Sequence, residues 1–548
     1  MSAATIDQSD ALARQHAAER AHAAWRPSHN PWLIALTVTM ATFMEVLDTS
    51  IANVALPHIG GNLSASQDEA TWILTSYLVS NAIILPISAW LATTFGRKRF
   101  YMTCVALFGV SSFLCGLAPS LGALVFFRVL QGFGGGGLAP SEQAILADTF
   151  PPARRGMAFA IYGMAVVCAP AIGPTLGGWI TDNYSWRWIF YINVPIAILS
   201  LILTNRMVED PPYLKEERER VSKIRVDFAG LGLIAVGIGC LQVVLDKGQE
   251  ADWFATWWIT GLLFVAIVTL AIFVFWEWNH DHPIVDVKLF KLRNFSTTIF
   301  FTFMLGMVLF GSTVLIPQFL QSLLGYPAVK AGEALSGGAL VMIVMMPLAG
   351  MLVSRMDQRL MILIGFASTA LSLLYLTHLY IGMDFKTIAL MRIYQTLGLA
   401  FIFLPSNTLA YYGVPRIKNN QVSGINSFAR NIGGSIGIAV LSTFLIRQSQ
   451  KHLTYLSAHA FSGNPAFDSM INSMKGLFMR DGQAAAGAFG ATQQAYQELW
   501  GMMQAQAANL AYIDVISGMA VVVACLIPFV FLMKRPPKAA GAGQTVGH

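Results

Sequence analysis

Fourteen apolar runs, each long enough to cross a lipid bilayer, constrain the fold of this chain more than any other feature. A membrane-spanning helix needs about 20 mostly apolar residues. Only 12% of the 548 residues are charged and 55% are hydrophobic, so the chain lacks the polar surface of a water-soluble protein. We therefore predict an all-α polytopic membrane protein. The predicted spans are 32–56, 71–93, 100–118, 121–146, 157–181, 187–206, 228–246, 257–277, 296–320, 331–354, 359–381, 386–412, 421–446 and 511–533.

The Lys and Arg residues are divided unevenly between the two sides of this topology. With both termini on the cytoplasmic side, 24 of the 35 fall in cytoplasmic segments and eight in outer segments. The other three, Arg128, Arg392 and Arg430, lie within spans. An excess of basic residues on the cytoplasmic side is the rule for membrane proteins. We therefore predict cytoplasmic termini, and the net charge of +6 needs no nucleic-acid partner.

The stretch RVLQGFGGGG at 128–137 contains the spacing G-x-G-x-x-G of dinucleotide-binding loops. That motif indicates a nucleotide site when it follows a strand, and here it lies in an apolar run with no strand pattern nearby. Small residues in a membrane helix let another helix approach closely, so we expect these glycines to pack helices. The chain also lacks a Gly-Lys dipeptide, and therefore lacks a P-loop. We expect no cofactor, and no metal at the isolated pair His280 and His282.

A weak internal repeat divides the chain into two halves. RVLQGFG at 128–134 returns as RIYQTLG at 392–398, an offset of about 264 residues. Spans two to four then correspond to spans ten to twelve, which leaves six spans per half and two extra spans between them. The predicted parts are a cytoplasmic tail (1–30), a six-helix bundle (31–206), a linker with two additional spans (207–294), a second six-helix bundle with a long periplasmic loop at about 447–510 (295–533), and a cytoplasmic tail (534–548).

Several segments resemble one transporter family. LDTSIANVALP (47–57), RVLQGFGGG (128–136), IGPTLGGWI (172–180) and PIVDVKLFKLRNF (283–295) are similar to motifs of the fourteen-span drug:proton antiporters of the major facilitator superfamily, the EmrB/QacA group. LDKGQEADWF (245–254) resembles the EmrB multidrug exporters most. The resemblance implies a major facilitator fold and export coupled to a proton gradient.

The loop after the second span departs from the family pattern. The family reads G-x-L-A-D-R-x-G-R-K, where this chain has AWLATTFGRK. Gly96, Arg97 and Lys98 of the predicted cytoplasmic gate loop are present, whereas Thr93 replaces the acidic partner of that gate. The sequence leaves open how this gate is held shut.

Four residues are candidates for proton coupling: Asp48, Glu45, Arg128 and Gln131. An ionised group near the bilayer centre costs several kcal/mol, so each one needs a reason. Glu45 and Asp48 share one helical face, and two close carboxylates in a medium of low dielectric resist joint ionisation. The resemblance implies a coupling role for Arg128. The structural alternatives are a static ion pair for Arg128 and a helix-bracing role for Asp48.

The predicted substrate cavity combines polar and flexible apolar side chains. Glu142 is either a contact for substrate cations or an interfacial acid, and Arg430 lines a cavity or braces helices. Methionine suits varied apolar ligands, although the same residues also face lipid in many membrane helices. The predicted lining consists of Glu142, Asn426, Arg430, Met304, Met307, Phe310 and Met345.

The fifth span carries the segment that resembles the antiporter motif. Pro174 removes a backbone hydrogen bond and bends the helix, and the glycines permit close packing and hinging. We predict a hinge formed by Gly173, Pro174, Gly177 and Gly178.

These residues predict a drug:proton antiporter that exports hydrophobic or amphipathic toxic compounds across the bacterial inner membrane. The alternatives are a dedicated exporter of one metabolite, such as an aromatic acid or a siderophore, and a non-transporting scaffold or a membrane enzyme. The resemblance to EmrB implies a periplasmic membrane-fusion adaptor (EmrA-like) and an outer-membrane channel (TolC-like). The segment 447–510 is the candidate contact for the adaptor, or else a simple tether between spans.

Overall fold

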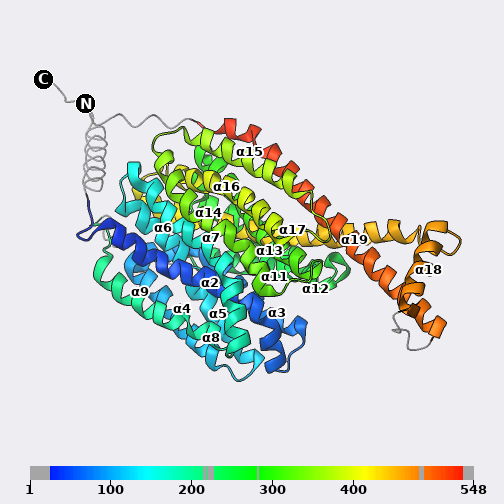
Figure 1. Cartoon of the computed structure of the whole chain (residues 1–548). Helices are drawn as coiled ribbons and strands as arrows, with labels where there is room; N and C mark the ends of the chain where they lie inside the picture. The colour runs from blue at the N-terminus through cyan, green and yellow to red at the C-terminus, as the bar shows by residue number, and fades with distance from the viewer. Residues whose placement is uncertain are drawn as a thin grey trace, which may run out of the picture.

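The computed structural model describes residues 25–212, 214, 218, 227–280, 283–480 and 487–534 (Figure 1). These residues form helices, 3₁₀ turns and connecting loops, with no strand among them. Most of the predicted N-terminal tail, most of the basic segment 215–225, His282 and almost all of the C-terminal tail lie outside the described residues.

The fourteen predicted spans are confirmed, and most of their boundaries agree within a few residues. The first half contains α2 (Pro31–Asn62), α3 (Gln67–Phe95), α4 (Arg97–Leu117), α5 (Leu121–Gly135), α6 (Leu138–Thr149), α7 (Pro152–Asn183), α8 (Trp188–Tyr191) and α9 (Asn193–Met207). The two extra spans are α11 (Phe228–Lys247) and α12 (Trp257–Asn279). The second half contains α13 (Arg293–Ser322), α14 (Ala328–Val353), α15 (Gln358–Leu376), α16 (Phe385–Ala410), α17 (Asn419–Ser457), α18 (Pro465–Arg480) and α19 (Gly487–Leu526).

Local sequence signals set where these helices begin. The side chain of Asn30 caps α2, accepting a hydrogen bond from the backbone N–H of Trp32. Ser66 and Glu69 form a reciprocal capping box at the start of α3. Gly96 joins α3 to α4 with φ of +88°, a left-handed conformation that favours glycine, so two long helices meet at a single residue.

The glycine-rich stretch packs helices, as its composition predicts. A Cβ on Gly132 would lie 1.9 Å from the hydroxyl of Ser80 on α3, and one on Gly134 would lie 2.7 Å from the backbone of α4. The fourth span breaks into α5 and α6 at Gly136 and Gly137. At each of these glycines, a neighbouring helix occupies the space that a side chain would fill.

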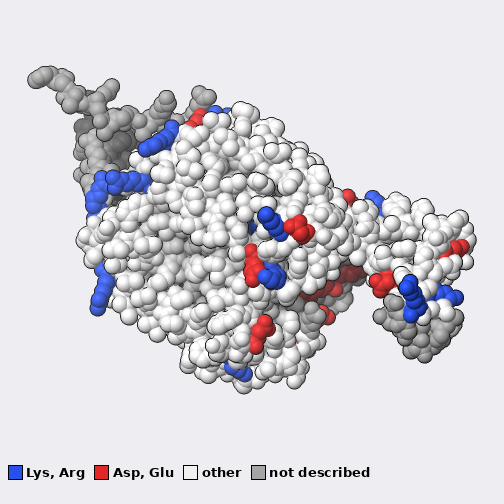
Figure 2. Space-filling model, viewed as in Figure 1, with Lys and Arg blue, Asp and Glu red and all other residues white. Residues whose placement is uncertain are grey.

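The two halves meet along α7, which packs against α2 of its own half and against α14 and α16 of the other. The extra helix α11 packs on α3 and α17, and α12 packs on α11 (Figure 1). We call the end of the bundle where α2 begins and α19 finishes the terminal end, and the opposite end the far end. On the face in Figure 2, Lys and Arg gather at the terminal end, the middle of the body is nearly free of charge, and charges of both signs lie toward the far end.

The segment 447–510 is mostly helix rather than loop. α17 continues to Ser457 and α19 already starts at Gly487, so both helices extend well past their predicted spans. With α18, which packs on α19, they form an arm that projects from the far end of the bundle (Figure 1). The arm exposes charges of both signs and large apolar side chains, including Phe461, Leu477 and Met479 (Figure 2).

Candidate functional site

A buried ion pair joins α2 to α5 in the first half. Arg128 Nη1 lies 2.6 Å from Asp48 Oδ2, and neither side chain is more than 1% exposed. Because both charges are removed from water, each is stabilised mainly by the other. Two of the four predicted coupling residues are therefore in direct contact.

Neutral amide side chains donate hydrogen bonds to the other carboxylate oxygen of Asp48. Its Oδ1 accepts hydrogen bonds from Gln131 Nε2 at 3.0 Å and Asn193 Nδ2 at 2.7 Å. Gln131 also accepts from Arg128 Nη1 at 2.8 Å, so the predicted Gln131 is part of the cluster. Asn193 begins α9, which places a third helix against the same carboxylate.

Tyr77 connects this pair to Glu45. The Arg128 guanidinium lies 4.3 Å from the centre of the Tyr77 ring, which favours a cation–π contact. The Tyr77 hydroxyl donates to Glu45 Oε1 at 3.4 Å, and Asn81 Nδ2 donates to the same oxygen at 3.0 Å. Glu45 is partly exposed, whereas Asp48 is buried, so the two carboxylates of one helical face have different surroundings.

A second polar cluster spans the meeting of the two halves. Glu142 accepts a 2.5 Å hydrogen bond from Thr39, and its Oε2 has no donor among the described residues. Arg430, from the second half, donates through Nη2 to the hydroxyl of Tyr162 in the first half, and its guanidinium lies 5.7 Å from the Phe403 ring centre. Arg430 acts electrostatically on both Glu45 and Glu142 without an ion-pair contact to either.

Amide side chains extend this cluster. Asn426 Nδ2 donates to Gln143 Oε1 at 3.0 Å and to Asn407 Oδ1 at 2.8 Å, and Asn426 Oδ1 accepts from Thr302. Gln143 Nε2 donates to Ser427 at 2.7 Å across the same boundary. The predicted cavity residues Asn426 and Arg430 thus lie in one interhelical network.

The gate loop at the terminal end is bound to a carboxylate from another helix. Arg97 forms an ion pair with Asp148 at the end of α6 and donates through Nε to Asn420 of α17 at 2.8 Å. Asn420 in turn donates to Thr93. Lys98 faces elsewhere, donating through Nζ to the backbone of α9.

The part of α7 that contains Pro170 and Pro174 packs closely against α2. Pro174 has no N–H, so the carbonyl of Pro170 one turn earlier has no helical donor, and the Ser50 hydroxyl donates to it at 3.2 Å. A Cβ on Gly173 would lie 2.4 Å from that hydroxyl, and one on Gly177 would lie 3.0 Å from Ile51. The predicted hinge is therefore a close contact between α2 and α7.

Comparisons with known proteins identify the family. A family model described as Major Facilitator Superfamily matches residues 38–438. The chain belongs to the Major Facilitator Superfamily. It is 36% identical to "Multidrug export protein EmrB" of Escherichia coli K12 over 463 residues, 84% of this chain and 89% of the relative. It is also 36% identical to "Fatty acid resistance protein FarB" of Neisseria gonorrhoeae over 518 residues, 93% of this chain and 97% of the relative.

Structural comparison agrees with this family. The solved structure of the proton:xylose symporter XylE bound to 6-bromo-6-deoxy-D-glucose aligns with a TM-score of 0.57 at 14% identity, covering 91% of this chain and 96% of XylE. The predicted major facilitator fold and the resemblance to EmrB proteins are confirmed. Family and fold indicate a multi-pass membrane transporter rather than an enzyme.

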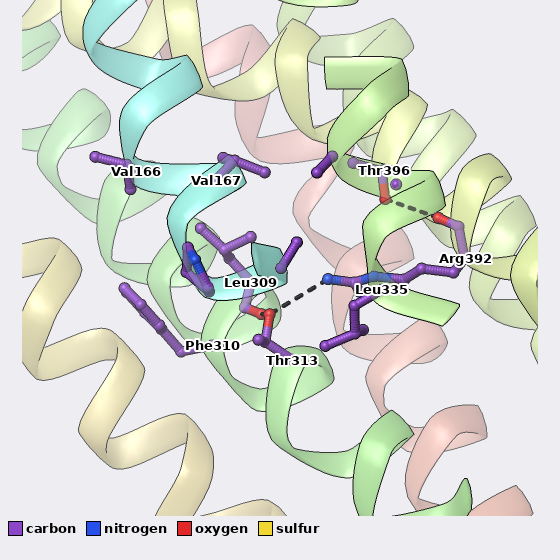
Figure 3. A pocket seen from close by; sticks show the side chains of 12 residues that line it. Val166, Val167, Leu309, Phe310, Thr313, Leu335, Arg392 and Thr396 are labelled. Carbon is purple, nitrogen blue, oxygen red and sulfur yellow. Dashed lines mark hydrogen bonds between the residues drawn. The ribbon is translucent and has the colours of Figure 1, made fainter. Parts of the chain in front are cut away.

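The second half of the chain holds its own buried arginine, Arg392, beside a pocket (Figure 3). Arg392 is 5% exposed and donates to Gln395 Oε1 at 2.5 Å, Ser312 Oγ at 3.1 Å and Thr313 Oγ1 at 3.3 Å. None of these partners is a carboxylate. The pocket lies between α7 on one side and α13, α14 and α16 on the other.

The predicted Met and Phe lining is distributed over several surfaces. Phe310 packs on Gly434 of α17 and also lines the Arg392 pocket. Met307 packs on Gly437 of α17, while Met304 and Met345 pack against the main hydrophobic cluster. Of the four, Phe310 lines a pocket that the structure shows.

Several site residues escaped the sequence analysis because it considered ionised groups first. Five neutral polar residues inside predicted spans belong to these clusters: Tyr77, Asn81, Tyr162, Asn193 and Gln143. The first four bond to or stack on a charged group, and Gln143 donates to the hydroxyl of Tyr162. A search for every polar residue within a span would have found them. Asp148 was missed because it sits at a span end, where an acid faces water at little cost.

Proposed function

We propose that this protein is a proton-coupled exporter of hydrophobic or amphipathic toxic compounds, a drug:H⁺ antiporter of the bacterial inner membrane with cytoplasmic termini. The names of two relatives, a multidrug export protein and a fatty acid resistance protein, support export of such compounds. The uneven distribution of Lys and Arg supports the orientation, which makes the terminal end cytoplasmic.

The observation that carries the proposal is the pair of carboxylates, Glu45 and Glu142, where the two halves meet. Neither has an ion-pair partner among the described residues, although both feel the charge of Arg430. A carboxylate in a membrane interior is stabilised by protonation unless a cation approaches it. Protons and positively charged or polar substrates therefore compete for the same groups, and that competition is the requirement for antiport.

Asp48 and Arg128 transmit this competition to the helix packing of the first half. Tyr77 contacts the guanidinium of Arg128 through its ring and Glu45 through its hydroxyl. A change in the charge of Glu45 therefore alters the field at the ion pair. Because the pair links α2 and α5, and Asn193 adds α9, its rearrangement moves three helices relative to one another.

In a cell with two membranes, the arm is the contact for a periplasmic adaptor, which connects the exporter to an outer-membrane channel. The arm projects from the far end, which is periplasmic in this orientation, and it exposes Phe461, Leu477 and Met479. Removal of α18 should leave drug flux in isolated vesicles intact and abolish drug resistance of intact cells. Loss of flux in both assays would indicate that the arm is needed for folding instead.

Drug flux in inverted membrane vesicles tests the coupling. With an acidic interior, vesicles containing the wild-type protein should accumulate ethidium, and an uncoupler should abolish the accumulation. Glu45→Gln and Glu142→Gln should each lower the gradient-driven rate at least tenfold. Glu277→Gln is the matched control, because Glu277 is a buried carboxylate of α12, outside the two clusters. Equal losses in all three variants, or a wild-type rate independent of the gradient, would refute the coupling scheme.

A further inference from the structure

The segment LDKGQEADWF (245–254) belongs to neither of the polar clusters described above. It ends α11 and forms the turn that leads toward α12, at the far end of the bundle. In this turn Asp252 and Trp253 both adopt a left-handed backbone, with φ of +55° and +48°. Such a conformation is costly for residues other than glycine, so it is maintained by contacts with the surroundings.

The turn presents Trp253 to the second half of the chain. Its backbone N–H donates to the carbonyl of Gly248 at 2.7 Å, and its ring packs on Gly248, where a Cβ would lie 2.6 Å away. The indole Nε1 then donates to the hydroxyl of Thr443 on α17 at 3.0 Å. Earlier along α17, Ser435 accepts from Gln242 Nε2 of α11, also at 3.0 Å. Among the described residues, two neutral hydrogen bonds therefore join α11 and its turn to the second half.

The contacts of α11 with the first half involve charged groups instead. Asp246 accepts a hydrogen bond from Thr75 of α3, and Lys247 donates to Thr71 of the same helix. The Lys247 ammonium also lies 5.4 Å from the centre of the Trp72 ring. Because a hydrogen bond with an ionised partner is the stronger kind, α11 is fixed more firmly to α3 than to α17.

α11 bridges the two halves on the side nearer the far end. α3 and α17 touch directly near the terminal end, where Asn420 of α17 donates to Thr93 of α3 at 3.1 Å. Toward the far end, α11 packs against both helices, and a Cβ on its Gly239 would lie 3.4 Å from Ile83 of α3. In a transporter whose halves rock about a central site, closing one end opens the other. The bonds from α11 to α17 are thus formed while the terminal end is joined, and they lie toward the end that is free to open.

We propose that α11 and its turn (228–256) form a strap that limits how far α3 and α17 separate at the far end. The strap moves with α3, to which its charged residues are bound. Its two bonds to α17 can be made and broken within a transport cycle, because a neutral hydrogen bond contributes little net stability. The proposal rests on the proposed export function, in which the bundle opens alternately toward its two ends.

Removing the two acceptors on α17 tests this role and leaves the strap itself unaltered. Ser435→Ala combined with Thr443→Val deletes both hydroxyls with little change in size. Trp253→Phe deletes one of the two donors from the opposite side. Thr260→Val is the matched control, because Thr260 is an exposed residue of α12 whose hydroxyl donates to the carbonyl of Thr256.

Double electron–electron resonance measures the separation at the far end in the full-length protein in lipid nanodiscs. The spin labels are attached at Asp68→Cys on α3 and Arg447→Cys on α17, both exposed positions. Cys240 and Cys525, the cysteines that are not buried, are replaced by serine.

We expect the double variant to increase the long-distance population about threefold or more over the wild type, because it loses both bonds to α17. Trp253→Phe should shift the distribution in the same direction by less, and Thr260→Val should leave it unchanged. If the double variant does not fold, Trp253→Phe decides by the same readout. A wild-type distribution in the double variant, or an equal shift in Thr260→Val, would overturn the proposal.

Ethidium flux separates failure of the strap from failure of the proposed function. Gradient-driven accumulation by the wild type, together with an unchanged distance distribution in the double variant, refutes the strap alone. A distance shift in the double variant without gradient-driven flux by the wild type supports the strap and refutes the coupling.

Discussion

The ion pair between Asp48 and Arg128 should dominate the stability of the first half, and substitution of either partner measures it. At 2.6 Å between Nη1 and Oδ2, Coulomb's law with an effective dielectric constant of about 20 gives roughly 6 kcal/mol of attraction. Most of this energy offsets the desolvation of the two charges. Removing one partner therefore costs more than the net contribution of the pair, because the other charge stays buried.

We expect Asp48→Asn and Arg128→Met each to lower the free energy of unfolding by about 3–5 kcal/mol, the range for one uncompensated buried charge. In Asp48→Asn, Gln131 and Asn193 still have an oxygen to bond, so the loss is one of charge rather than of packing. The double variant leaves no unpaired charge. Its loss should fall at least 2 kcal/mol short of the sum of the two single losses.

Equilibrium unfolding of the purified protein in mixed micelles, titrated with dodecyl sulfate and followed by circular dichroism, measures these free energies. Arg392→Met is the internal control, because Arg392 has no carboxylate partner among the described residues. Its removal should change stability by less than about 1 kcal/mol or stabilise the protein. Single losses at Arg128 no larger than those at Arg392, or strict additivity in the double variant, would refute the reasoning.

Two further predictions concern the contacts between helices. Arg97→Gln should open the terminal end, because it removes the guanidinium that donates to Asn420 of the second half and pairs with Asp148 of the first. Spin labels on the ends of α3 and α17 should report a longer distance population, and an unchanged distribution would contradict this role. Gly173→Ala should lower stability by about 1–3 kcal/mol, because its new Cβ would lie 2.4 Å from the Ser50 hydroxyl. Gly232→Ala, which meets open space, should not destabilise the protein, and equal thermal unfolding midpoints of the two variants would refute the packing argument.

Span number and the division into repeated halves were accessible from sequence because both depend on local properties. Apolar length and the recurrence of Arg-x-x-Gln at 128 and 392 need no knowledge of which helices touch. The helical arm was harder to predict. Residues 447–510 are polar and rich in alanine, so a hydropathy threshold ends the spans at the membrane surface, whereas the helices α17 and α19 continue beyond it.

The site was predictable in part. Charged residues within spans identified Asp48, Arg128 and Arg430, because their burial cost demands a reason. Sequence spacing does not reveal which residues from distant helices satisfy them. Tyr162 and Arg430 are 268 positions apart, and the contact between them depends on how the halves dock. The sequence left the partner of the gate loop open for the same reason: Thr93 lacks the family's carboxylate, and Arg97 pairs with Asp148 of another helix.

The three arginines within the spans are stabilised against the cost of burial by three different sets of contacts. Arg128 has a carboxylate partner in Asp48. Arg430 contacts a hydroxyl and two aromatic rings. Arg392 donates only to neutral side chains among the described residues. The three arginines therefore lie in three different electrostatic environments, and a substitution of one should leave the contacts of the other two in place.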